Sequence, residues 1–473
     1  MMLLWLPVGL LLPTLSGWLL LNLMEGRTPV LLRMERWILG FLLGLTGTME
    51  LTFLARWADL IILDRWGFLS IQIVLTMLLT IVFLLQRHFF PPNLNPNPNL
   101  NLNPNPTPFV LKIALILALI WTFVKLAMGG FILVTTPPFF DDTVKNWNLR
   151  GKIFFLTGDM PLSMHALEPE AIDPLSSYPP TVSLAKASLA TLAGKWQEGL
   201  VNSIHLLWFL ALIGLLYAAV RRQTSVLWGL WSIVAFVSLP LVLFHGVNAY
   251  ADLFLAAHLF AAVHLLFLAV REQDDVQRNA LLRLFALATA LLTFTKNEAL
   301  VLHLPVLLAL FAGFLALRLK QHVISVKTCA TAAGWLLGCF LIVLLPWLIY
   351  KWSNGLTFGN AKSITGTFAG WQPYVLKTLW INTFFEGNWH LLFPLLFALM
   401  ALQWRRAFRS PLLVLVGFLL TSLALQTGLF LFTSLSAEAL LQTGFARGLL
   451  QLSPLAMFLT LMLARETLQE DEG

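Results

Sequence analysis

Two adjacent carboxylates, Asp141 and Asp142, lie a few residues beyond the end of an apolar run, in the segment TTPPFFDDTVKNWNLRGK. A carboxylate at membrane depth suits a general base, which takes a proton from an acceptor hydroxyl or amine. The same pair could also contribute ligands to a divalent metal. Alternatively, the pair is solvated or caps a helix that begins at TVKNWNLRGK.

Arg447 stands at the beginning of the last apolar run, after Gln442. An arginine at membrane depth is costly unless it is paired or binds an anion, and its planar guanidinium matches the oxygens of a phosphate. Alternatively, it anchors the helix by extending its charge to the interface.

Further polar residues stand near the ends of other apolar runs: Tyr178 and Pro179 in SSYPP, Asp252 in NAYADLF, Lys296 and Glu298 in TFTKNEA, and Glu386 and His390 in FFEGNWH. Lys296 and Glu298 occupy a tight turn, where charged side chains either belong to a site or act as interfacial anchors. Glu386 and His390 either line an acceptor pocket or belong to an interfacial belt anchored by Trp389.

Cofactor motifs are missing from the sequence, which contains neither a P-loop nor a Gly-rich dinucleotide fingerprint. Cys329 and Cys339 are the only cysteines and share one apolar segment, so the sequence encodes neither a disulfide framework nor a zinc site. No cofactor is required by these patterns, and a divalent metal at Asp141 and Asp142 is the one that they allow.

The elements that position these residues must be transmembrane helices. Of 473 residues, 58% are hydrophobic and only 11% are charged, whereas roughly a quarter are charged in a soluble fold. Because a spanning helix needs about 20 residues, the apolar runs predict an all-α polytopic membrane protein with about thirteen spans, in a range of about twelve to fourteen. We place the spans near residues 2–24, 37–55, 68–86, 109–133, 201–220, 226–245, 249–270, 281–295, 299–317, 330–350, 389–403, 411–434 and 447–464.

Basic residues divide the short loops between two faces. Lys and Arg concentrate in every second loop, at 221–222, 271–283, 318–327 and 405–409. The positive-inside rule assigns this face to the cytoplasm, with the N-terminus outside and the C-terminus inside. Most of the net charge of +7 therefore orients the chain and predicts no nucleic-acid partner. We expect a multi-pass protein of a bacterial-type plasma membrane.

The composition along the sequence divides the chain into four predicted segments. They are an N-terminal three-span block at 1–90, an Asn/Pro-rich cytoplasmic linker at 91–108, a transmembrane core at 109–464 and an acidic cytoplasmic tail at 465–473. The linker is assigned because proline at every second or third position forbids a helix. Two long hydrophilic stretches of the core, 135–200 and 351–388, face the external side. The first continues from Tyr178 into an apolar helix that would lie along the membrane surface.

The order of these motifs resembles that of the GT-C superfamily of integral membrane glycosyltransferases. The resemblance covers residues 109–464 and is to the bacterial dolichyl-phosphate-mannose-protein mannosyltransferases and aminoarabinose transferases. It implies a GT-C-like core with juxtamembrane helices in the first long external loop. Two features depart from the family pattern: many relatives carry Asp-Glu where this chain has Asp141-Asp142, and the block at 1–90 has no counterpart.

The resemblance also implies a reaction. A sugar would pass from a polyprenyl-phosphate donor to a lipid, glycan or protein acceptor on the external face, by an inverting displacement. Asp141 or Asp142 would be the catalytic base, and Lys296 with Arg447 would bind the donor phosphate. Tyr178, Pro179, Asp252, Glu298, Glu386 and His390 would support the site or the acceptor pocket.

The alternative is a polytopic transporter, or a flippase or ligase that acts on lipid-linked glycans. The predicted number of spans suits these classes equally well. Such transporters show internal repeats and broken helices at matching places in two halves. We see no such symmetry, and the polar residues gather at the external ends of the spans. The paired aspartates also argue against a ligase, which needs basic residues more than a carboxylate base.

Overall fold

The computed structural model describes residues 2–89, 109–164, 171–358 and 368–470. Within these ranges, helices are the only regular secondary structure apart from one isolated bridge between Phe368 and Thr433. The predicted linker at 91–108 and the last three residues of the predicted tail lie outside the described residues.

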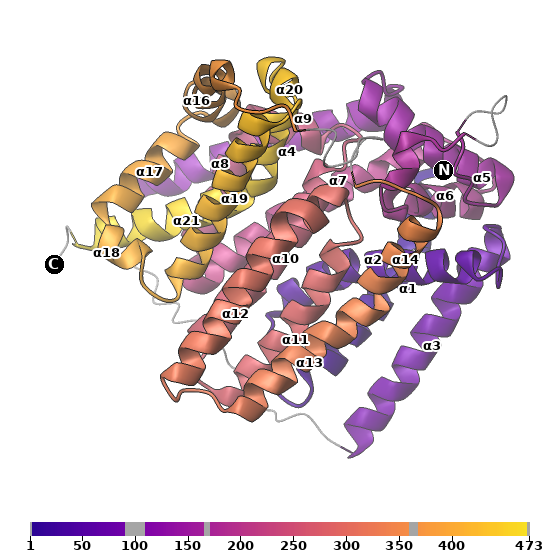
Figure 1. Cartoon of the computed structure of the whole chain (residues 1–473), viewed down its shortest axis with the longest axis horizontal. Helices are drawn as coiled ribbons and strands as arrows, with labels where there is room; N and C mark the ends of the chain where they lie inside the picture. Colours follow the sequence, from indigo (N-terminus) through magenta and orange to yellow (C-terminus); the bar gives the residue numbers. More distant parts are fainter. Residues whose placement is uncertain (1, 90–108, 165–170, 359–367, 471–473) are drawn as a thin grey trace.

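The N-terminal block consists of α1 (Trp5–Glu25), α2 (Arg33–Trp57) and α3 (Arg65–Phe89). Glycines allow α1 and α2 to pack closely, since a Cβ on Gly17 would lie 2.0 Å from the Gly40 carbonyl oxygen. A Cβ on Gly44 would lie 2.2 Å from the Pro13 carbonyl oxygen. Small residues of this kind let membrane helices bring their backbones together. In contrast, α3 lies at the edge of the bundle (Figure 1).

Gly44→Ala is expected to destabilise the protein by about 1–3 kcal/mol, because the added methyl group would overpack the contact between α1 and α2. Gly47→Ala is the matched control: its Cβ would meet only Leu291, at 3.8 Å. Both changes raise helix propensity equally, so the difference between their melting temperatures in detergent reports the contact. Equal melting temperatures would show that the two helices do not depend on this approach.

The core contains the remaining long helices together with several short ones. Its bundle consists of α4 (Phe109–Thr135), α7 (Glu198–Gln223), α8 (Val226–Ser238), α9 (Pro240–Gly246), α10 (Asp252–Arg271), α11 (Asp275–Leu292), α12 (Leu304–Lys320), α13 (Val326–Ile342), α14 (Leu344–Ser353), α17 (Leu392–Leu402), α18 (Trp404–Ala407), α19 (Leu412–Phe432), α20 (Ser436–Leu440) and α21 (Gly444–Glu470). Helix α10 lies in the middle of the bundle (Figure 1), and every residue from 252 to 270 is buried.

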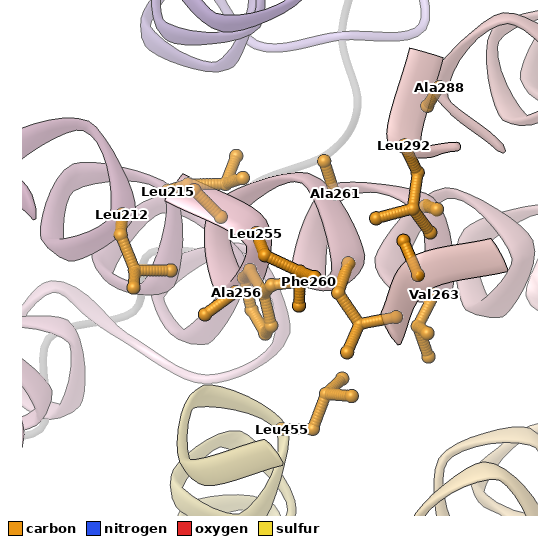
Figure 2. Close-up of a cluster of buried hydrophobic side chains, with 14 of the residues drawn as sticks. Leu212, Leu215, Leu255, Ala256, Phe260, Ala261, Val263, Ala288, Leu292 and Leu455 are labelled. Atoms are coloured by element: carbon orange, nitrogen blue, oxygen red, sulfur yellow. The ribbon is translucent and has the colours of Figure 1, made fainter. Parts of the chain in front are cut away.

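Apolar side chains surround α10 on several sides. Figure 2 shows Phe260 of α10 in a cluster with Leu212 of α7, Leu292 of α11 and Leu455 of α21. Polar contacts add to this packing where α10 meets the N-terminal block, since His258 Nε2 lies 2.9 Å from the Thr46 hydroxyl of α2. The N-terminal block is therefore packed directly on the centre of the core.

The number of spans differs in part from the prediction. Among the described residues, ten helices are long and apolar enough to cross a membrane, or up to twelve if each of two bent pairs is one span. Helices α8 and α9 bend by 83° at Pro240, which cannot continue the helical hydrogen bonds. The second pair joins Pro373–Trp389 to α17 with a bend of 112°.

These helices confirm the all-helical, multi-pass prediction. Helix α11, where we predicted a span at 281–295, has 18 residues that include Asp275, Arg278 and Arg283, and it is not among the twelve. The predicted count of about thirteen therefore depends on α11 and stays a prediction.

The basic loops gather at one end of the bundle. The contacts that join them are Arg222 to Glu35 (2.9 Å), Arg283 to the Met24 carbonyl (2.6 Å), Arg318 to the Val270 carbonyl (2.8 Å) and Arg465 to the Gln223 carbonyl (2.7 Å). This arrangement agrees with the predicted common face, and the assignment of that face to the cytoplasm stays a prediction.

The described parts of the predicted external stretches form short helices at the other end. These are η2 (Asp142–Leu149), a π-helix continued by α5 (Arg150–Thr157), then η3 (Pro174–Ser177), α6 (Thr181–Ala193), η5 (Pro373–Val375), α16 (Leu376–Phe384) and η6 (Gly387–Trp389). The turn between α11 and α12 contains the short π-helix η4 (Ala299–His303). The apolar helix predicted after Tyr178 corresponds to α6.

Candidate functional site

Charged side chains from four separate segments meet at this end of the bundle. They are Asp142 of η2, Asp252 of α10, Lys296 and Glu298 before η4, and Arg447 of α21. We call these five residues the ion-pair network. Since the segments lie up to 305 positions apart in sequence, only the folded helix bundle brings the charges together.

Asp252 is the centre of the network and is fully buried in the first turn of α10. Its Oδ1 accepts hydrogen bonds from Lys296 Nζ at 2.9 Å and from Gln451 Nε2 at 3.2 Å. Its Oδ2 accepts a hydrogen bond from Arg447 Nε at 3.0 Å. The positive end of the helix dipole also favours a carboxylate in this position. Asp252 therefore holds two cations in fixed positions.

Arg447 joins the buried part of the network to its accessible part. While its Nε binds Asp252, its Nη1 donates a hydrogen bond to Asp142 Oδ2. The Arg447 and Asp142 side chains are 26% and 31% exposed, whereas that of Asp252 is not exposed at all. The Arg447 guanidinium also lies 5.5 Å from the ring centre of Tyr250. A ligand from outside could therefore reach Asp142 and Arg447 but not Asp252.

Lys296 lies behind Arg447 and is buried. Its Nζ lies 2.9 Å from both Asp252 Oδ1 and Glu298 Oε1, and 6.0 Å from the ring centre of Trp147. Burial alone lowers the pKa of Lys296, but the charges of Asp252 and Glu298 outweigh it and raise the pKa above its usual range. Lys296 therefore stays positively charged at neutral pH.

Tyr178 and Pro179 lie beside the network. The Tyr178 ring packs edge-on against Trp147, with the ring centres 5.8 Å apart, and Pro179 is buried. Burial, together with the negative charge of Glu298, raises the pKa of Tyr178 well above its usual range. Arg150 Nη1 donates a hydrogen bond to the Tyr178 carbonyl at 2.7 Å. These contacts fix the SSYPP segment against η2.

Besides Tyr178 and Pro179, three of the predicted site residues lie outside the ion-pair network. Asp141 is 77% exposed and pairs with Lys145 at 2.9 Å, so the two adjacent aspartates have different surroundings. Glu386 Oε2 accepts a hydrogen bond from Gln442 at 3.2 Å. His390 Nε2 lies 3.0 Å from the Ser238 carbonyl.

Sequence reasoning missed several residues that position the network. His245 Nδ1 lies 3.5 Å from Asp252 Oδ2, and the imidazole ring lies 4.4 Å from that of Tyr250. Gln451, which binds Asp252, follows Arg447 by one helical turn, so helical spacing could have identified it. No local spacing indicates His245, because the bend at Pro240 brings α9 toward α10.

A second external stretch is attached to the same region by Lys351 of α14. Its Nζ donates hydrogen bonds to the Ser177 carbonyl at 2.5 Å and to the Thr357 carbonyl at 2.6 Å. Because Lys351 is buried, these bonds replace water around its charge. The lysine thus connects the residues after α14 to the segment that carries Tyr178.

Among the described residues, no group of three or more His, Cys, Asp or Glu side chains could hold a metal ion. The predicted pair of metal ligands is also divided, because Asp141 pairs with Lys145 while Asp142 pairs with Arg447.

No family model, curated protein or solved structure matches this chain. The resemblance to GT-C glycosyltransferases therefore rests on the sequence motifs alone.

The network combines a carboxylate and a guanidinium at a surface that solvent reaches. An anion that binds Arg447 would compete with Asp142 for the same guanidinium, while Asp252 keeps the arginine in place. Loss of its partner would leave Asp142 free to accept a proton. The geometry therefore suits a reaction in which anion binding and proton removal occur next to each other.

Proposed function

We propose that the chain is an integral membrane glycosyltransferase that takes a sugar from a polyprenyl-phosphate donor and transfers it to an acceptor on the external face. The observation that carries this proposal is the pairing of Asp142 with Arg447, whose guanidinium is held by the buried Asp252. The order of the motifs, which resembles that of GT-C enzymes, supports the same reaction. The acceptor would be a lipid, a glycan or a protein.

In the proposed reaction, the donor phosphate binds Arg447 and displaces Asp142. The acceptor oxygen or nitrogen then forms a bond to the anomeric carbon while the bond from that carbon to the phosphate oxygen breaks. The electron pair of the broken bond leaves with the phosphate, whose charge Arg447 stabilises, with Lys296 as a second positive charge behind it. The acceptor proton passes to Asp142. A single displacement of this kind inverts the anomeric centre.

Arg447→Met is expected to weaken the binding of a polyprenyl phosphate by about 10- to 100-fold, the usual loss for a hydrogen bond to a charged group. Undecaprenyl phosphate serves as the probe, and its binding is measured as the rise in melting temperature of the purified protein. Arg409→Met, which removes an exposed arginine from a predicted cytoplasmic loop, is the matched control. Equal binding by both variants would remove Arg447 from the donor site.

Transport of a lipid-linked glycan is a second candidate, because one observation favours it. The 83° bend between α8 and α9 places His245 3.5 Å from Asp252, and transporters often use such broken helices to form their binding sites. The two functions differ in their products. A glycosyltransferase releases free polyprenyl phosphate from the charged donor, whereas a transporter moves the intact donor across proteoliposome membranes.

A further inference from the structure

A long apolar groove of about 700 Å³ runs between α1, α2 and α7. Leu10 and Leu11 of α1, Trp37 and Phe41 of α2, and Leu207 and Leu210 of α7 contribute to its lining. Its lining includes no residue of the ion-pair network, so the groove is separate from the proposed active site. It follows the boundary between the N-terminal block and the core.

The groove faces the surroundings of the bundle, since Leu11, Trp37 and Leu210 are all exposed. Its one hydroxyl group, that of Thr14, already donates a hydrogen bond to the Leu10 carbonyl at 2.7 Å. In a bilayer this surface meets hydrocarbon, so its occupant must be apolar along the length of the groove.

The lining favours a flexible chain over another helix. Membrane helices pack through small residues, as α1 and α2 do at Gly17, Gly40 and Gly44. In contrast, nine of the thirteen residues that line the groove are leucine, isoleucine, methionine, tryptophan or phenylalanine. Such bulky side chains keep a helix backbone at a distance, whereas an acyl chain can adapt to their irregular surface.

A positive charge lies at one end of the groove. Arg33 is exposed and directly precedes Met34, which lines the groove. The neighbouring charges are already paired, Arg36 with Glu25 at 2.8 Å and Glu35 with Arg222 at 2.9 Å. Among the described residues, no hydrogen bond or ion pair involves the Arg33 side chain. Arg33 is therefore available to an anionic group outside the bundle.

We propose that this groove binds one acyl chain of an anionic phospholipid, whose headgroup contacts Arg33. The part of α2 that lines the groove, from Met34 to Phe41, is about 10 Å long at 1.5 Å per residue. If the headgroup contacts Arg33, the acyl chain would lie along this part of α2. It would extend into one half of a hydrocarbon core that is about 30 Å thick. The lipid would belong to the leaflet of the basic loops and would fill the boundary between block and core.

The test measures which phospholipids the full chain retains. The purified, delipidated protein in detergent is titrated with phosphatidylglycerol or phosphatidylcholine of the same acyl chains, and bound lipid is counted by native mass spectrometry. One phosphatidylglycerol molecule should be retained about fivefold more strongly than phosphatidylcholine, the factor expected for one basic residue at an anionic surface. Arg33→Gln should abolish this preference, while Arg33→Lys should keep it.

Two further variants separate the groove from general lipid adhesion. Leu210→Trp, a change at an exposed position, should fill the groove and lower the retention of both lipids. Arg409→Gln removes an arginine from another basic loop and should change neither. Equal retention of the two lipids by the wild type, or an Arg33→Gln variant that behaves like Arg409→Gln, would overturn the proposal. Melting temperatures establish that each variant is folded.

Discussion

Asp142→Asn is expected to lower the rate of sugar transfer by about 10²- to 10⁴-fold, the range for loss of a general base. The amide keeps the size of the carboxylate but cannot accept the acceptor proton. Asp141→Asn should retain most of the activity, because Asp141 is exposed and pairs with Lys145 instead of Arg447. The measurement is the release of polyprenyl phosphate from a panel of polyprenyl-phosphate-linked sugars in proteoliposomes.

The two adjacent variants control each other, since each removes one negative charge from the same segment. Undecaprenyl phosphate should still bind to the Asp142→Asn variant, because Arg447 loses a competitor for the phosphate. A variant that binds the lipid phosphate but does not transfer sugar would locate the defect in proton removal. Full activity of Asp142→Asn would contradict its role as the base, and loss of activity in Asp141→Asn alone would transfer that role to Asp141.

The sequence allowed much of the fold to be predicted, because membrane helices have a strong signal in composition. Apolar runs indicated the long helices, and the basic residues grouped loops that meet at one end, such as the two joined by the contact of Arg318 with the Val270 carbonyl. Bends were harder to predict. Pro240 lies within an apolar run, and only the structure shows that α8 and α9 meet at 83°.

The charged residues of the candidate site could be predicted from the sequence, but the contacts between them could not. Few charges occur near the external ends of the spans, so Asp252, Lys296 and Arg447 were easy to single out. The sequence could not distinguish Asp141 from Asp142, because the difference arises from which side of the first turn of η2 faces α21. It also could not show that Glu386 and His390 lie outside the network, since both stand in a loop with polar neighbours.

Asp252→Ala is expected to destabilise the protein by about 3–5 kcal/mol, because two cations would lose their buried partner. Asp252 accepts hydrogen bonds from both Lys296 and Arg447 and has no exposed surface. Thermal unfolding in detergent, followed by tryptophan fluorescence, measures the loss. The control is Asp275→Ala, which breaks an ion pair between Arg278 and a carboxylate that is 69% exposed. That change should cost about 1 kcal/mol or less.

A double variant distinguishes charge pairing from simple loss of packing. If the cost of Asp252→Ala comes from uncompensated charge, then Lys296→Met in the same chain should restore part of the stability, because it removes one of the two cations that have lost Asp252 as a buried partner. A loss of packing would instead make the two changes additive. Equal melting temperatures for Asp252→Ala and Asp275→Ala would contradict the central role of Asp252. Partial recovery would mean that Asp252 balances the charges of Lys296 and Arg447, which is what a site for an anionic donor requires before the donor arrives.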